Sequence, residues 1–271
     1  LGLLLTGLGR PKEAERHYRQ GMKIREKHLD ENPESSEALS GLAHLSNNLG
    51  EMLRNQKRLS EAEQLHRRAL KWRQEQFAKT PHASPARAAL AESLGNLGLA
   101  LKDSGRWREA GQAYLQALQL VERLLTTHPI DRGLRFHHSA ICHNLATLRE
   151  HEGKSEEAED FYRKGLERAR KLTAEFPGMP AYGSLLAECH LSLGSLLEKQ
   201  QKPAEAEQQI RQGLDVLRKL SGENPSVPGY ACDLAVGHVR FGGILREQRK
   251  GAEAEGSYRD ALKILDALVQ R

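Results

Sequence analysis

The chain has 271 residues and a net charge of +5, with 28% charged and only 5% aromatic side chains. No apolar run approaches the roughly 18 residues that a membrane-spanning helix needs, and no secretory leader is visible. The three cysteines, Cys142, Cys189 and Cys232, include no closely spaced pair, which disfavours a disulfide framework and favours a reducing compartment. We therefore expect a cytoplasmic chain without membrane contact.

The main feature of the sequence is a repeat of 48 residues. Six alanines keep this spacing: Ala14, Ala62, Ala110, Ala158, Ala206 and Ala254. Five prolines keep it too: Pro33, Pro81, Pro129, Pro177 and Pro225. Glycine recurs at Gly2, Gly50, Gly98, Gly194 and Gly242, with Ala146 in the remaining slot. Such a period is typical of one supersecondary unit stacked many times, so we expect a single array over residues 1–271.

In chain order, the repeat predicts six helix pairs. Their ranges are 1–32, which has only part of its first helix, then 37–80, 84–128, 133–176, 180–224 and 228–271. Alternating runs of β-branched residues are nearly absent, which disfavours strands. The chain begins in mid-pattern at Leu1, so we expect it to be a segment of a longer protein.

The pair at 37–80 illustrates the pattern. Its first helix has an apolar face of Leu42, Leu45, Leu49, Met52 and Leu53. Ser60 and Glu63 then form a capping-box pattern at the start of the second helix, and Ser155 is a candidate cap in a later pair. Pro81 ends the second helix, and glycines such as Gly9, Gly105 and Gly153 suit left-handed turns inside the pairs.

Recurring small residues predict close contact between the two helices of a pair. The residue seven positions after each repeating alanine is always Gly or Ala. The residue four positions after the same alanine is large, as in Tyr114 and His66. A glycine in mid-helix, such as Gly98, costs roughly 1 kcal/mol relative to alanine. Its recurrence at that cost predicts that a facing side chain approaches the backbone closely.

These residues resemble the tetratricopeptide repeat. Leu49-Gly50, Ala62, His66 and Ala69 follow its pattern, as do Leu97-Gly98, Ala110, Tyr114 and Ala117. The usual period is about 34 residues, and the longer one here is similar to the repeats of kinesin light chains and of arrays appended to bacterial Ser/Thr protein kinases. The resemblance implies an all-α, helical-hairpin solenoid with a right-handed superhelix. It also implies a non-catalytic, protein-binding scaffold whose groove is lined by the first helix of each pair.

The candidate binding residues follow from that implied groove. The position two before the recurring glycine holds Asn48, Asn96, Asn144, Ser192 and Arg240. We call the first three the asparagine ladder, because each amide could hydrogen-bond the backbone of an extended peptide. The other candidates are Asn47, Glu51, Arg54, Lys102 and His143. The alternative is that the asparagines bond only to the next helix and stabilise stacking.

Charge leaves the partner open. Residues 54–73 carry seven Lys or Arg against Glu61 and Glu63, and Arg54 and Lys102 add positive charge to the predicted groove. An acidic protein or peptide is one partner that fits, and nucleic acid bound through 54–73 with Trp72 is a lesser alternative. A solvated helix face without a ligand explains the same pattern.

No enzyme motif, cofactor or metal site is expected. The chain lacks phosphate-loop, zinc-protease, serine-hydrolase and kinase signatures. His138 and Cys142 are four residues apart, but no second pair completes a four-ligand zinc site. A longer parent protein could still carry a separate catalytic domain such as a kinase, which this array would regulate. Apolar residues at both ends, including Leu4 and Leu265, leave end-to-end self-association as a further alternative.

Overall fold

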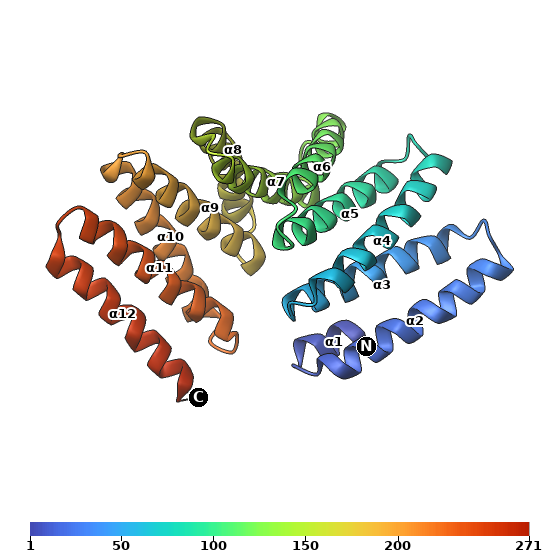
Figure 1. Ribbon diagram of the computed structural model, residues 1–271, viewed down its shortest axis with the longest axis horizontal. Helices are drawn as coiled ribbons and strands as arrows, with labels where there is room; N and C mark the ends of the chain where they lie inside the picture. The colour runs from blue at the N-terminus through green and yellow to red at the C-terminus, as the bar shows by residue number, and fades with distance from the viewer. Residues whose placement is uncertain (271) are drawn as a thin grey trace. The chain divides into compact units, whose positions relative to one another are not determined.

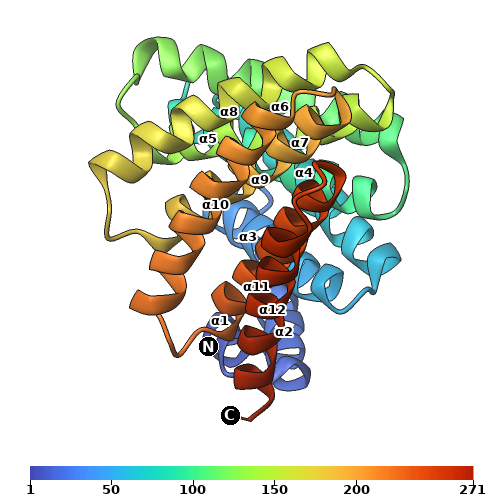
Figure 2. The ribbon, with the colours of Figure 1, turned by 90° about the vertical axis from the view of Figure 1, so that its left-hand side faces the viewer.

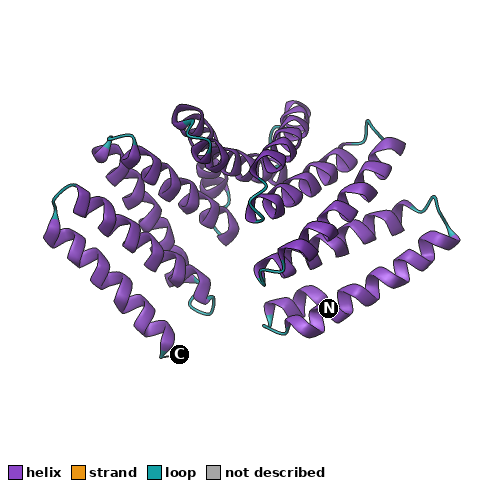
Figure 3. Cartoon of the chain, in the orientation of Figure 1, coloured by secondary structure: helices purple, strands orange, loops and turns teal. Residues whose placement is uncertain are grey.

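The computed structural model describes residues 1–270, which form twelve α-helices joined by short turns and contain no strand (Figure 3). The helices are α1 (Gly2–Gly7), α2 (Pro11–Glu31), α3 (Ser36–Asn55), α4 (Leu59–Lys79), α5 (Ser84–Asp103), α6 (Trp107–Thr127), α7 (Arg132–His151), α8 (Ser155–Glu175), α9 (Pro180–Lys199), α10 (Pro203–Glu223), α11 (Pro228–Glu247) and α12 (Gly251–Val269). They belong to two compact units, Leu1–Pro129 and Ile130–Arg271 (Figure 1). The expected all-α repeat fold is confirmed.

Each unit stacks successive helix pairs. The two helices of a pair are joined by a tight turn, so they are antiparallel neighbours. The second helix also packs against the first helix of the next pair, as α10 does against α11 in Figure 2. Successive pairs therefore share buried core residues, in the second unit from α7 to α12 and in the first from α1 to α4, and most of the helical stability comes from this packing.

The recurring alanines and glycines lie where helices touch. All six alanines of the repeat are buried. The mid-helix glycines face the large residue of the second helix, and a Cβ on Gly98 would lie 2.7 Å from Cε1 of Tyr114. Gly50 meets the ring of His66, and Gly242 that of Tyr258, in the same way. The predicted close approach is confirmed, because the ring occupies the space that a methyl group would need.

The turns inside the pairs use left-handed backbone. Gly9, Gly105 and Gly153 have φ values of 69°, 74° and 77°, as predicted. The equivalent turns of the other pairs hold Lys57, Gln201 and Arg249 at φ of 63°, 59° and 60°. A residue with a Cβ is strained in this region by roughly 1 kcal/mol, so three turns keep their geometry against local preference.

The predicted serine caps are wrong. Helix α4 begins at Leu59 after Arg58, so Ser60 lies inside it, and Ser155 is likewise already helical. Neither helix has a side-chain cap. The residue before α4 is instead a cation, and Arg58 pairs with Glu61 at 2.6 Å. The glutamate side chains near the helix start are thus bound by arginine and not by the backbone.

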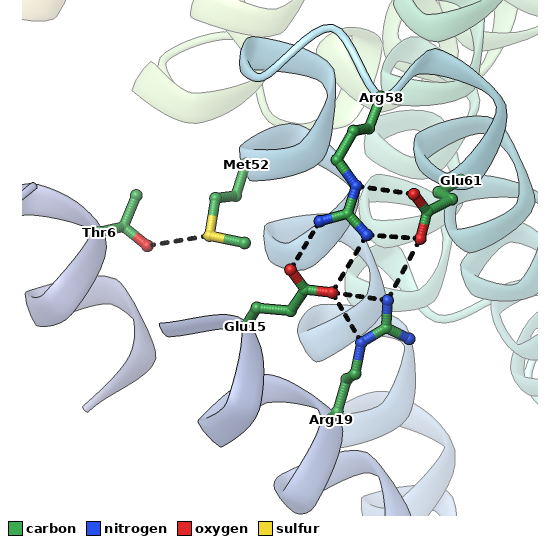
Figure 4. A network of polar contacts seen from close by, with 6 residues as sticks. All are labelled: Thr6, Glu15, Arg19, Met52, Arg58 and Glu61. Carbon is green, nitrogen blue, oxygen red and sulfur yellow. Dashed lines mark hydrogen bonds and ion pairs between the residues drawn. The ribbon is translucent and has the colours of Figure 1, made fainter. Parts of the chain in front are cut away.

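The second helices are linked by a network of ion pairs. Arg58 contacts Glu15 of the preceding pair at 2.7 Å, and Arg19 contacts Glu15 at 2.7 Å and Glu61 at 3.4 Å (Figure 4). Hydrogen bonding to Arg58 holds the pKa of Glu15 below its usual value. Exposed pairs contribute only about 0–1 kcal/mol each, so the network adds modestly to the shared core.

The network recurs at the same repeat positions. Three further groups have the same arrangement: Glu63 with Arg67, Arg106 and Glu109; Glu159 with Arg163, Lys202 and Glu205; and Glu207 with Arg211, Lys250 and Glu253. In each group a cation at the start of one second helix reaches back to a glutamate of the preceding second helix.

Candidate functional site

Two members of the asparagine ladder lie in the first unit with unused amides. Asn48 on α3 and Asn96 on α5 are both partly exposed. The two helices are neighbours, because Arg54 on α3 contacts Asp103 on α5 at 2.8 Å. Within residues 1–270, no hydrogen bond from protein atoms satisfies either amide. Each side chain therefore offers both its donor and its acceptor to solvent or to a ligand.

Asn47 has a different environment from its neighbour Asn48. Its side chain is buried, its Nδ2 donates to Ser93 Oγ at 3.0 Å, and its Oδ1 lies 3.2 Å from His66 Nδ1. Burial lowers the pKa of His66 to about 4, so its ring is neutral and donates from Nδ1. Asn47 thus joins α3 to both α4 and α5, and it is not accessible to a ligand while the helices stay packed.

The charged candidates of the first unit are partly neutralised. Glu51 is exposed, whereas Arg54 and Lys102 are partly covered. The 2.8 Å contact with Asp103 offsets the charge of Arg54. The attraction for an acidic ligand predicted from Arg54 is accordingly weakened on this face.

In the second unit, Asn144 on α7 is partly exposed and His143 is buried. His143 Nε2 lies 3.1 Å from Ser192 Oγ on α9, and its ring packs 5.4 Å from that of Tyr162. His143 is therefore part of the packing between helices, as Asn47 is in the first unit. Ser192, which His143 contacts, stands at the repeat position of Asn144 in the next pair.

A cavity that the sequence did not indicate lies beside Ser192. It has a volume of about 310 Å³ and lies between α9 and α11. The lining includes Glu188, Asp233 and Arg240 around apolar Leu191 and Val236. Burial, and then the charge of Glu188, raise the pKa of Asp233. The two carboxylates occupy different positions within the 48-residue repeat, so an alignment of repeat positions does not bring them together.

The basic stretch at 54–73 is largely paired. Four of its cations contact carboxylates on neighbouring helix pairs: Arg54 with Asp103, Arg58 with Glu15, Arg67 with Glu109 and Arg68 with Glu26. Arg73 is buried and donates to Ser40 Oγ at 3.1 Å. This arrangement favours a solvated, ion-paired surface over a patch that attracts an acidic partner or nucleic acid.

The described residues offer little for other chemistry. Among residues 1–270 there is no group of three or more His, Cys, Asp or Glu side chains placed to hold a metal ion. Cys142 Sγ lies 3.5 Å from His138 Nδ1, and both side chains are buried. None of the three cysteines, all within the described residues, forms a disulfide. None of the helices in this part of the chain is both long and apolar enough to cross a bilayer.

Comparison with known proteins identifies the repeat. The chain matches the tetratricopeptide repeat over residues 1–34, 42–75, 90–130 and 139–172, which together are more than half of its length. The chain belongs to the tetratricopeptide repeat family. Arrays of this family are typical protein-interaction scaffolds and are generally non-catalytic. None of the curated proteins compared with this tetratricopeptide chain matches it significantly.

Solved structures share the tetratricopeptide fold. BtubC (BKLC) from P. vanneervenii has a TM-score of 0.73 at 20% identity, over 95% of this chain and 91% of that one. The TPR-like repeats of a Podosopora anserina protein assigned as a kinesin light chain give 0.56 at 17% identity, over 83% and 95%. The apo form of RapI gives 0.58 at 14% identity, over 100% and 97%. At these identities the likeness shows the fold alone.

Proposed function

We propose that this chain is a non-catalytic protein-interaction module that binds a segment of a partner on the exposed face of its first helices. The observation that carries the proposal is the contrast between neighbours: Asn47 is used in packing, whereas the amides of Asn48 and Asn96 have no hydrogen-bond partner in the described chain. Stacking therefore does not require these two amides. A backbone amide of an extended peptide matches their combination of donor and acceptor.

The same proposal assigns a preference to the second unit. The cavity between α9 and α11 places Glu188 and Asp233 beside an apolar surface, with Arg240 also in its lining. A lysine or arginine side chain of the partner fits this environment, because its stem packs on Leu191 and Val236 while its charge meets the carboxylates. A preformed site loses less free energy on binding than one that must first become ordered.

The test uses peptides selected on the native chain from a phage-displayed random library. The variant is Asn48→Ala with Asn96→Ala, and the control is Gln112→Ala with Gln116→Ala, two exposed residues of α6. We expect both variants to melt as the native chain does, since neither loses an internal hydrogen bond. Peptides that contact the first unit should bind the asparagine variant about tenfold more weakly, which is ~1.4 kcal/mol, and the control unchanged.

Three outcomes decide the proposal. Equal affinity of the native chain and the asparagine variant would place binding elsewhere. A variant that unfolds would show that the amides are structural. If Glu188→Gln with Asp233→Asn leaves the affinity of lysine- or arginine-containing peptides unchanged, the cavity does not select a basic side chain.

Self-association is a second candidate, favoured by apolar side chains at both terminal helices. Leu3, Leu4 and Leu8 are exposed near the start, and Leu262 and Leu265 are exposed on α12. These surfaces resemble the core that other pairs bury against a neighbour. Sedimentation at several concentrations tests this: association that disappears in Leu262→Gln with Leu265→Gln would support it, and a concentration-independent monomer would remove it.

A cytoplasmic location is part of the proposal. No disulfide joins the three cysteines of the described chain, buried Cys142 and Cys189 and exposed Cys232, which fits a reducing compartment. The ion pairing of residues 54–73 gives no support to nucleic-acid binding.

A further inference from the structure

A cavity separate from the asparagine ladder lies between the last helix pair and the helix that precedes it. It has a volume of about 410 Å³ and is lined by α10, α11 and α12, of which α11 packs against both of the others (Figure 2). Its lining includes Leu214 of α10, His238 and Phe241 of α11, and Gly256 and Ser257 of α12. This volume is within the range of about 300–1,000 Å³ that small-molecule sites occupy.

The preceding repeat explains why the cavity exists. Forty-eight residues earlier, Gln208 and Gln209 stand in the places of Gly256 and Ser257. The Oε1 atom of Gln209 lies 2.8 Å from Nδ1 of His190, the residue equivalent to His238. A carboxamide thus satisfies the histidine there. In the last pair the shorter side chains leave this volume open, and a Cβ on Gly256 would meet no atom within 4 Å.

His238 keeps hydrogen-bonding capacity as a result. Ser257 Oγ donates to the carbonyl oxygen of His238 at 2.9 Å and lies 3.4 Å from its Nδ1. Nδ1 therefore has only a long contact in place of the 2.8 Å contact of His190. No hydrogen bond within residues 1–270 uses Nε2 of His238. A neutral imidazole offers one N–H donor and one lone pair, and a primary carboxamide can satisfy both kinds of group.

The charged groups at the rim have counter-ions, and the weakest contact is that of Asp260, which lies 3.7 Å from Lys263 of the same helix. Arg211 contacts Glu207 at 2.8 Å and Glu253 at 3.6 Å, and Arg218 contacts Asp215 at 2.7 Å. Arg211 also covers the ring of Phe241, with 4.7 Å between its Cζ and the ring centroid. Since these charges already have counter-ions, the cavity does not favour a strongly charged ligand.

We propose that this cavity is a binding site for a neutral primary carboxamide, whose amide takes the place beside His238 that the Gln209 side chain takes beside His190. The apolar part of the ligand packs against Leu214 and Phe241. Two sources supply this chemistry: a free small molecule with a planar carboxamide, or a glutamine side chain of a bound peptide.

The experiment measures binding of two probes to the full chain by saturation-transfer NMR: benzamide, and glutamine blocked as its N-acetyl methylamide. Benzoate, which has the same shape and a negative charge, is the control for charge. We expect benzamide or blocked glutamine to bind with a millimolar dissociation constant, as fragments of this size do, and benzoate to bind at least about tenfold more weakly. The tighter of the two amides identifies the source of the ligand.

The repeat supplies matched variants in both directions. Gly256→Gln with Ser257→Gln introduces the residues of the preceding pair and should abolish binding. Gln208→Gly with Gln209→Ser should open an equivalent cavity at His190 and double the number of sites. Circular dichroism confirms that both variants are folded.

The outcomes are distinct. Loss of binding in the filled variant, or a second site in the opened one, would support the proposal. Unchanged binding by the filled variant would overturn it, as would equal binding of benzoate. If neither amide binds the native chain, the cavity is only a hydrated hollow.

Discussion

Burial of a neutral histidine should make the first unit sensitive to acid. The His66 side chain extends from α4 toward α3, where it hydrogen-bonds Asn47, and it is 1% exposed. Burial, and secondarily the charge of Arg54, lower its pKa to about 4, against roughly 6.5 in an unfolded chain. Between these values the unfolded state binds more protons than the folded state. The stabilisation is therefore complete above about pH 6.5 and is lost as the pH falls toward 4.

The size of the effect follows from the two pKa values. One pKa unit corresponds to about 1.4 kcal/mol, so the full difference is roughly 3 kcal/mol, and about 2.5 kcal/mol of it is lost by pH 4.5. His66→Gln keeps an amide near Asn47 and removes the titrating ring. We expect the free energy of unfolding of this variant to fall about 2.5 kcal/mol less than that of the parent between pH 7.5 and 4.5.

The assay can report on the first unit alone. The chain has two tryptophans, Trp72 and Trp107, and both lie in that unit. Urea unfolding followed by tryptophan fluorescence at each pH gives the required free energies. His82→Gln, at an exposed residue of the turn before α5, is the control and should keep the pH dependence of the parent. The reasoning is refuted if His66→Gln loses as much stability as the parent over this range.

Three further predictions concern stability in thermal or urea unfolding. Gly98→Ala should destabilise by about 1–3 kcal/mol, because the new methyl group overlaps the facing tyrosine ring; Gly95→Ala in the same helix meets no atom within 4 Å and should stabilise by up to about 1 kcal/mol. A loss at both glycines would contradict this explanation. Gln201→Gly should stabilise by about 0.5 kcal/mol, since relief of left-handed strain exceeds the entropy cost of glycine; a lower melting temperature would count against it. Glu15→Gln should cost about 1 kcal/mol at low salt and less at high salt, because it removes contacts with Arg58 and Arg19, and a salt-independent loss would point to packing instead.

Features set by the repeat period were predictable from sequence. The contact between Gly98 and Tyr114 and the left-handed turn at Gly105 both follow from residue types that recur at fixed positions. Steric contacts within one helix pair decide such features. The residue types found at a single position of the 48-residue repeat are therefore sufficient to indicate them. The helix pairs and the all-α class were predictable for the same reason.

Features that depend on contacts between several positions of the repeat were not predictable. Ser60 and Glu63 fit a cap, but Arg67 of the same helix and Arg106 of the next pair bind that glutamate. The positive charge of residues 54–73 was summed without the carboxylates that lie on neighbouring helix pairs, such as Glu15 and Asp103. Asn47 and Asn48 are adjacent in sequence, and only the packing shows that the first is used by α4 and α5.

The ion-pair network has a consequence for how such a chain changes length. In four of the helix pairs the cation at the start of the second helix binds backward, as Lys202 does to Glu159 at 2.9 Å and Lys250 to Glu207 at 2.6 Å. If residues 203–250 were deleted, Lys202 would stand directly before α12, and its contact with Glu159 would be kept. Arg163 would then face Glu253 in the place of Glu205. A repeat flanked by two such groups can thus be lost without leaving an unpaired charge between second helices, so the ion pairs do not oppose a change of length by one whole repeat.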